Sequence, residues 1–106
     1  MVQTAYPPTR DITYQPFNIF FSYALDLLDE VIFNAIRESA DRIRDVAIAD
    51  GQDIRNAPLY PNYAIFDTPL EDMYGGNVGR LQALKQNVDP SNVMGLAGGW
   101  KFDNRD

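Results

Sequence analysis

The amino-acid sequence predicts an α+β fold, in which a small antiparallel sheet packs against one long helix and short C-terminal helices and is completed by dimerisation. Three observations carry this prediction. Apolar side chains occupy every second position over residues 17–23, apolar side chains recur at helical spacing over residues 25–50, and shorter helical stretches follow between prolines and glycines. A chain of 106 residues has room for a single domain, so we expect one domain over residues 1–106.

Residues 12–24, ITYQPFNIFFSYA, predict a strand because they are rich in β-branched and aromatic side chains. Pro16 can lie only at the start or on an edge of that strand. Its apolar face consists of Phe17, Ile19, Phe21 and Tyr23. A lone strand leaves its backbone groups unpaired, so we expect a homodimer in which strands pair across a two-fold axis and helices cover one face.

Residues 25–50 predict one long amphipathic helix. Asp26 and Asp29 are well placed near its N-terminus, where carboxylates complement the helix dipole, and Asp50-Gly51 is a plausible stop. Acidic and basic side chains interleave on the polar side, which favours a solvated, salt-bridged surface over a metal site. The apolar side consists of Leu28, Val31, Ile32, Ala35, Ile36, Ala40, Ile43, Val46 and Ala47.

Shorter elements are predicted over the rest of the chain, where proline and glycine punctuate the sequence. The chain begins with an extended arm over 1–11, and a loop with a short strand is expected over 52–69. A short helix from Thr68-Pro69 to Tyr74 is followed by a break at Gly75-Gly76 and by a helix over 77–87, which Asp89-Pro90 ends. A flexible tail is expected over 95–106. Trp100 and Phe102 are possible anchors of that tail. The glycines over 75–79 lack the spacing of a dinucleotide fingerprint, so we interpret them as a helix junction.

Composition excludes several classes of function. The formal net charge is -6 and no basic stripe is present, which argues against nucleic-acid and anionic-membrane partners. The sequence has neither cysteine nor histidine, so we expect no metal centre and no triad based on those residues. The polar, proline-containing start is unlike a signal peptide and the apolar run over 17–28 is too short to span a bilayer, so we expect a cytoplasmic protein.

The residues Tyr60-Pro-Asn-Tyr63 combine two phenols and an amide within an apolar stretch. From the residues alone, a core strand whose hydroxyls find backbone partners is the simpler interpretation. Further motifs follow at Tyr74-Gly-Gly-Asn77, Arg80-Leu81…Lys85 and Asp89-Pro-Ser-Asn-Val93. Together they resemble the C-terminal region of FAD-linked oxidoreductases of the berberine-bridge-enzyme-like family, over roughly residues 14–102.

The resemblance implies that Asn62 is a pocket amide beside the flavin ring and the substrate, with Tyr60 and Tyr63 as wall or hydrogen-bonding residues. It implies structural roles for the later motifs: a helix that packs under the FAD domain and a terminal turn. The family's FAD-binding domain, with its covalent His or Cys attachment, has no counterpart here. We therefore expect no bound cofactor, and we do not expect the chain alone to be a flavin oxidase.

Two function hypotheses follow from the resemblance and the residues. In the first, the chain is a cofactor-free, pericyclase-like isomerase or cyclase of natural-product biosynthesis, which acts by preorganising a hydrophobic small-molecule substrate in an apolar pocket. Its catalytic residues are Asn62, Tyr63 and Tyr60, and its substrate-binding residues are Phe17, Ile19, Phe21 and Tyr23. In the alternative, the chain is a non-catalytic or split subunit that completes a separate FAD-linked oxidoreductase. A third interpretation is a truncated gene product with no activity.

Overall fold

The computed structural model describes residues 4–6 and 15–103, which form two compact units. The first, here called the α1 unit, consists of described residues 15–57. The second, here called the terminal unit, consists of residues 58–103 together with residues 4–6. The predicted single domain over 1–106 stays a prediction.

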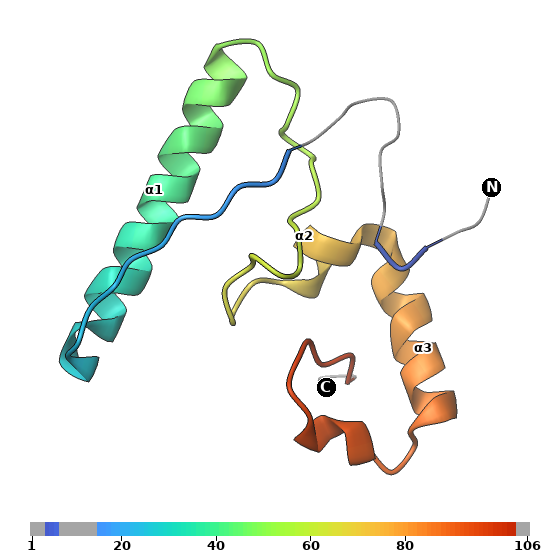
Figure 1. Cartoon of the computed structure of the whole chain (residues 1–106). Helices are drawn as coiled ribbons and strands as arrows, with labels where there is room; N and C mark the ends of the chain where they lie inside the picture. The colour runs from blue at the N-terminus through green and yellow to red at the C-terminus, as the bar shows by residue number, and fades with distance from the viewer. Residues whose placement is uncertain (1–3, 7–14, 104–106) are drawn as a thin grey trace. The chain divides into compact units, whose positions relative to one another are not determined.

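The α1 unit contains an extended segment, the 3₁₀ helix η1 (Asp26–Leu28) and the helix α1 (Asp29–Ala49), which continues directly from η1 (Figure 1). This confirms the long helix predicted over 25–50. The helix also ends where expected, because the Asp50 N–H donates to the Val46 carbonyl at 2.9 Å and Gly51 then takes a φ of 93°. That left-handed conformation is easy for glycine and reverses the chain out of the helix.

The predicted sheet is wrong, because the described residues contain no strand. Residues 15–24 are extended in part but make no ladder of hydrogen bonds with another described residue, while residues 12–14 lie outside the described range. The second expected strand folds into turns, in which the N–H groups of Tyr63 and Ala64 both donate to the Tyr60 carbonyl. Because a strand needs a partner to satisfy its backbone groups, the alternation over 16–24 produces no sheet.

The terminal unit is built from short helices. They are α2 (Leu70–Tyr74), the 3₁₀ turn η2 (Gly75–Asn77), α3 (Val78–Val88) and the 3₁₀ turn η3 (Val93–Leu96). Gly75 breaks the first helix as predicted, since its φ of 54° and ψ of -137° lie outside the helical region. Asp89 caps the end of α3 directly before Pro90, also as predicted.

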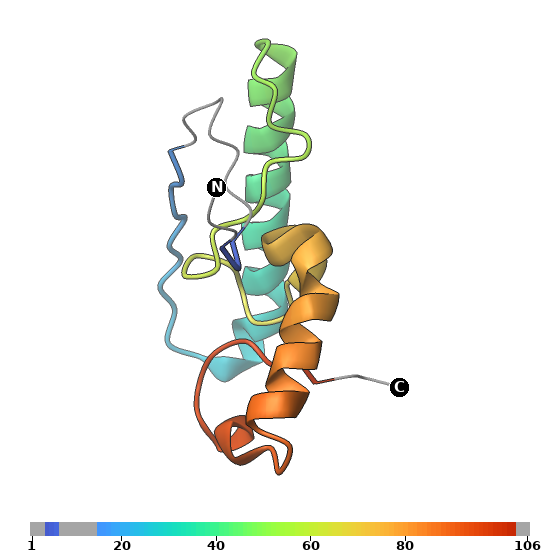
Figure 2. The same ribbon diagram turned by 90° about the vertical axis from the view of Figure 1, so that its right-hand side faces the viewer.

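Few side chains of the terminal unit are buried. Met73 is fully buried and Val78 is 7% exposed, and these are the buried hydrophobic residues of the described chain. Hydrogen bonds between distant segments complete the unit: the Leu59 N–H donates to the Asp72 carbonyl at 2.8 Å, and the Trp100 indole Nε1 donates to the Pro61 carbonyl at 3.0 Å. The C-terminal segment therefore returns towards the helices (Figure 2).

The loop after α3 is closed by Asp89. Its carboxylate accepts the N–H groups of Val93 at 2.7 Å and Met94 at 3.0 Å, and it pairs with the Lys85 ammonium at 3.3 Å. Desolvation by itself raises the pKa of Asp89, but the hydrogen bonds from Met94, Val93 and Lys85 outweigh it, so the pKa lies below its ordinary value. The folded turn thus favours the ionised form of the Asp89 carboxyl.

No helix in the described part of the chain combines the length and the apolar character that crossing a membrane requires.

Candidate functional site

The turn over residues 60–64 brings the three predicted catalytic residues together. The Tyr60 and Tyr63 rings meet edge to face, with centroids 5.0 Å apart and planes at 87°. The Asn62 side-chain amide donates to the Tyr60 hydroxyl oxygen at 2.9 Å. The turn itself is held by the hydrogen bonds that the Tyr60 carbonyl accepts from Tyr63 at 2.9 Å and from Ala64 at 3.1 Å.

The hydrogen bonding of this cluster defines its chemistry. Because the Asn62 amide donates to the Tyr60 oxygen, the Tyr60 hydroxyl proton remains able to donate to another acceptor. Tyr60 is 38% exposed and Tyr63 is 45% exposed, so both rings present surface to a ligand or a partner. The cluster can therefore contact an apolar ring and donate a hydrogen bond to an oxygen. The core-strand interpretation of these residues does not describe this exposed turn.

A third tyrosine contacts the cluster from the N-terminal arm. The Tyr6 ring meets the Tyr60 ring edge to face, with centroids 6.4 Å apart and planes at 88°. The Tyr6 hydroxyl donates to the Pro58 carbonyl at 3.2 Å. Tyr6 is not among the residues predicted from the sequence. No local pattern pointed to it, because the hydrogen bond joins positions 52 residues apart.

The C-terminal segment supports the turn from another direction. Besides the Trp100 hydrogen bond to Pro61, the Phe102 ring meets the Tyr74 ring with centroids 5.1 Å apart. Trp100 and Phe102 are thus confirmed as anchors of this segment. Desolvation by burial raises the pKa of Tyr74 above its ordinary value.

The four predicted substrate-binding residues belong to the α1 unit, whereas the catalytic cluster belongs to the terminal unit. Phe17 is 62% exposed and Phe21 is 41% exposed, and Ile19 is half-buried. Tyr23 donates its hydroxyl to the Asp29 carboxylate at 2.7 Å, and this hydrogen bond, followed by desolvation and the nearby acidic charges, raises the Tyr23 pKa. The structure places only Tyr60, Asn62 and Tyr63 in contact with one another, so a pocket shared with the substrate-binding residues stays a prediction.

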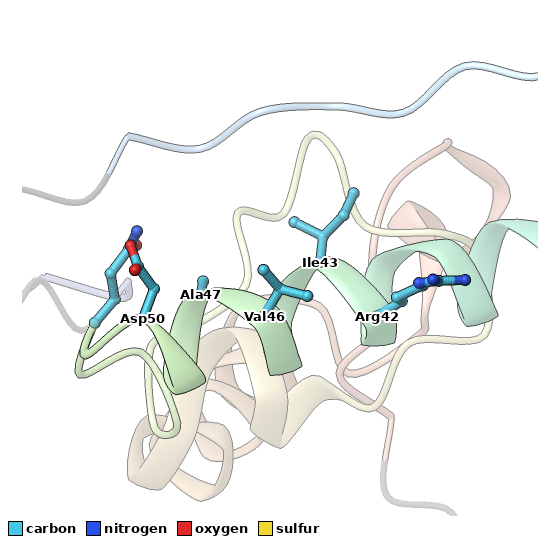
Figure 3. Close-up of a pocket in the computed structure, with 6 residues that line it drawn as sticks. Arg42, Ile43, Val46, Ala47 and Asp50 are labelled. Atoms are coloured by element: carbon cyan, nitrogen blue, oxygen red, sulfur yellow. The ribbon is translucent and has the colours of Figure 1, made fainter.

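Two hollows lie elsewhere on the described chain. One, of about 460 Å³, lies at the C-terminal end of α1, where Ile43, Val46 and Ala47 point from the helix beside Asp50 (Figure 3). The other, of about 230 Å³, lies between Lys85 and Lys101 in the terminal unit. Neither hollow is lined by a residue of the predicted site.

On the polar side of α1, Arg44 pairs with Asp41 at 3.0 Å, as expected for a salt-bridged surface.

Comparison with known proteins identifies the segment that carries the cluster. Residues 59–97 match the family model described as "Berberine and berberine like". The chain is also 37% identical over 94 residues to the FAD-linked oxidoreductase fogF of Aspergillus ruber (strain CBS 135680), an alignment that covers 87% of the chain. No solved structure matches the chain. The chain therefore carries a berberine-like segment and is homologous to a FAD-linked oxidoreductase, which confirms the resemblance.

The match is to a small part of that relative, since the chain spans 18% of its length. Tyr60, Asn62 and Tyr63 lie inside the residues that match the family model. The four predicted substrate-binding residues and Tyr6 lie outside them. The three predicted catalytic residues therefore lie together within the matched segment, and their role in a reaction stays a prediction.

Proposed function

We propose that this chain is the berberine-like portion of a FAD-linked oxidoreductase, which packs against the flavin-binding portion and presents Tyr60, Asn62 and Tyr63 to the substrate. One observation carries the proposal: many large apolar side chains are exposed, among them Phe20 at 86%, Leu27 at 78% and Phe66 at 71%. Burying one such side chain contributes about 1.5–3 kcal/mol. These side chains are exposed in the described chain, so they would contribute this stabilisation only when a partner surface covers them.

The choice of partner follows from the homology. The relative is a FAD-linked oxidoreductase, and the aligned part makes up 18% of it. We therefore expect the exposed apolar residues to pack against the remaining portion of such an enzyme. The formal net charge of -6 makes nucleic acid and anionic membranes poor alternatives.

The described residues do not fit a complete FAD site. The glycines over 75–79 form η2 and the first turn of α3, which does not make a phosphate-binding loop at the start of a βαβ unit. The sequence also has no His or Cys for covalent attachment. In this proposal the flavin is held by the partner portion, and Tyr60 and Tyr63 contribute ring surface and hydroxyl donors at the substrate.

The cofactor-free isomerase or cyclase reaction, its hydrophobic substrate and the homodimer all stay predictions. Such catalysis requires an apolar pocket that holds a reactive conformer. Within the terminal unit, the predicted catalytic cluster is exposed and lines neither described hollow. The structure thus offers no specific support for catalysis by the isolated chain, and the partner-bound function is preferred.

Complementation tests the proposed function. The A. ruber relative is produced without the segment that aligns to this chain, and this chain is co-expressed with it. We expect co-purification of the two chains and recovery of bound flavin, measured by its absorbance. The relative's own segment, supplied as a separate chain, is the positive control. If that control restores flavin binding and this chain does not, the proposal is wrong.

A matched pair of variants tests the surface that docks. Phe20→Asp places a charge on a side chain that is 86% exposed, so it should weaken co-purification without unfolding the free chain. Asn18→Asp adds the same charge at an exposed polar position of the same segment and should leave co-purification unchanged. Equal effects of the two variants would show that charge, rather than apolar contact, governs docking.

In the assembled enzyme, the cluster is tested by Tyr60→Phe and Asn62→Ala. Loss of one hydrogen bond made in the transition state lowers kcat by about 10²–10³. Both variants should therefore slow oxidation of the relative's substrate far more than any fall in the folded fraction explains, as shown by measuring rate and melting temperature on the same samples. A rate that falls only with the folded fraction would assign these residues a structural role.

A further inference from the structure

The N-terminal arm is attached to the berberine-like segment at several points. The Asn77 side-chain amide donates to the Ala5 carbonyl at 3.0 Å and to the Thr4 carbonyl at 3.3 Å. The Arg80 guanidinium lies 3.5 Å from the same Thr4 carbonyl. Asn77 and Arg80 belong to the residues that match the family model, whereas Thr4 and Ala5 do not. Side chains of the family segment therefore bind the backbone of the arm.

This attachment positions Tyr6. With the carbonyls of Thr4 and Ala5 held by Asn77, the next residue lies over the turn, where its hydroxyl donates to the Pro58 carbonyl and its ring meets Tyr60. A polar contact and an aromatic contact help to hold this side chain. The Tyr60 ring consequently has one ring against it from its own turn and another from the arm.

We propose that Tyr6 is a ligand-contacting residue of the site formed by Tyr60, Asn62 and Tyr63, positioned there by Asn77, and that this three-tyrosine site binds a planar aromatic ring. Tyrosine rings in edge-to-face contact offer further edges and faces to an aromatic ligand. The Tyr6 hydroxyl is engaged by Pro58, so this residue contributes its ring, whereas Tyr60 keeps a proton for an oxygen of the ligand. The inference rests on the proposed location of the site, but not on docking to a flavin-binding partner.

Ring binding by the full-length chain is tested with phenol, and cyclohexanol serves as the matched non-aromatic probe. NMR signals of the tyrosine rings are followed during titration. We expect phenol to shift the Tyr6, Tyr60 and Tyr63 signals in a saturable way, with weaker shifts from cyclohexanol. Tyr23, which lies in the α1 unit, is the internal control and should not shift.

Variants separate the contribution of Tyr6 from a general loss of structure. An aromatic pair contributes about 0.5–1.5 kcal/mol, so Tyr6→Leu should weaken phenol binding about two- to tenfold. Tyr6→Phe keeps the ring and should restore most of the affinity. Asn77→Ala removes the anchor of the arm and should weaken binding in the same direction. The Trp100 indole N–H signal, which reports the hydrogen bond to Pro61, should be unchanged in all three variants.

Two outcomes would overturn the inference. In one, phenol shifts Tyr60 and Tyr63 but Tyr6→Leu leaves the affinity unchanged, which would remove Tyr6 from the site. In the other, phenol and cyclohexanol act alike at every tyrosine, which would show that no ring site exists. Failure of the proposed function is distinguishable from both, because it is measured by flavin recovery with the partner and not by phenol binding.

Discussion

The α1 unit and the terminal unit differ in how their helices relate to a core. α1 has 21 residues and none of them is buried. The terminal unit has helices of 5 and 11 residues, yet among the described residues it holds both buried hydrophobic side chains, Met73 and Val78. It also has the hydrogen bonds that link distant segments, such as Trp100 to Pro61. The longest helix of the described residues is therefore not the one with buried side chains.

The difference teaches that a strong helical pattern does not by itself specify a core. The apolar side of α1 includes Val31 and Val46, each 63% exposed. A helix of this kind derives most of its stability from packing of that side, and none of the α1 residues is buried. The terminal unit, by contrast, buries Met73 and Val78 and is linked by turns and single hydrogen bonds.

The largest expected effect comes from the buried methionine of the terminal unit. Met73→Ala removes the fully buried side chain, and such a truncation costs about 2–5 kcal/mol. Urea denaturation followed by Trp100 fluorescence should show this loss in the free energy of unfolding. Leu96→Ala is the control, because Leu96 is 95% exposed. If both variants lower the free energy of unfolding equally, burial of Met73 does not stabilise the terminal unit more than the exposed Leu96 does.

The next effect concerns the link between the C-terminal segment and the turn. Trp100→Phe removes the indole N–H that donates to the Pro61 carbonyl. Loss of one such hydrogen bond costs about 0.5–1.5 kcal/mol. Hydrogen exchange of the α3 amides should become faster, and exchange of the α1 amides should not change. Faster exchange in α1 as well would show that the two units unfold together.

A matched pair of glycine substitutions compares the two main helices directly. Ala83 in α3 and Ala40 in α1 are both exposed, and replacing an exposed helical alanine by glycine costs about 1 kcal/mol. Ala83→Gly should shift the unfolding transition reported by Trp100. Ala40→Gly should lower the helical circular dichroism signal without shifting that transition. A shift from Ala40→Gly would mean that α1 stabilises the terminal unit.

The smallest effect is the response of the terminal unit to acid. The folded-state pKa of Asp89 is depressed, so its contribution to stability is present above about pH 4, where the unfolded carboxyl is ionised, and is lost as the pH falls through the lower folded value. Acid should therefore release Val93 and Met94 before α3 unfolds, as followed by their amide signals. Asp89→Asn should abolish this pH dependence; an unchanged profile would assign it to another group.

The candidate site could be predicted only in part. The Tyr60-Pro-Asn-Tyr63 motif and the family resemblance predicted that these side chains act together. The structure places them in contact, and their catalytic role stays a prediction. Tyr6 could not be predicted, because its position depends on Asn77 binding the arm 72 residues away. Contacts over such separations leave no local pattern in a sequence.

The sequence by itself determined where helices begin and end. Apolar spacing, Gly51, Gly75 and Asp89-Pro90 act within a few residues of the backbone they affect, so the bounds of α1, α2 and α3 follow from local chemistry. The tertiary structure decided the rest. An alternating segment becomes a strand only when a second strand accepts its hydrogen bonds, and residues 15–24 have none among the described residues. Pairing and ring contact depend on distant parts of the chain, and only the folded arrangement specifies them.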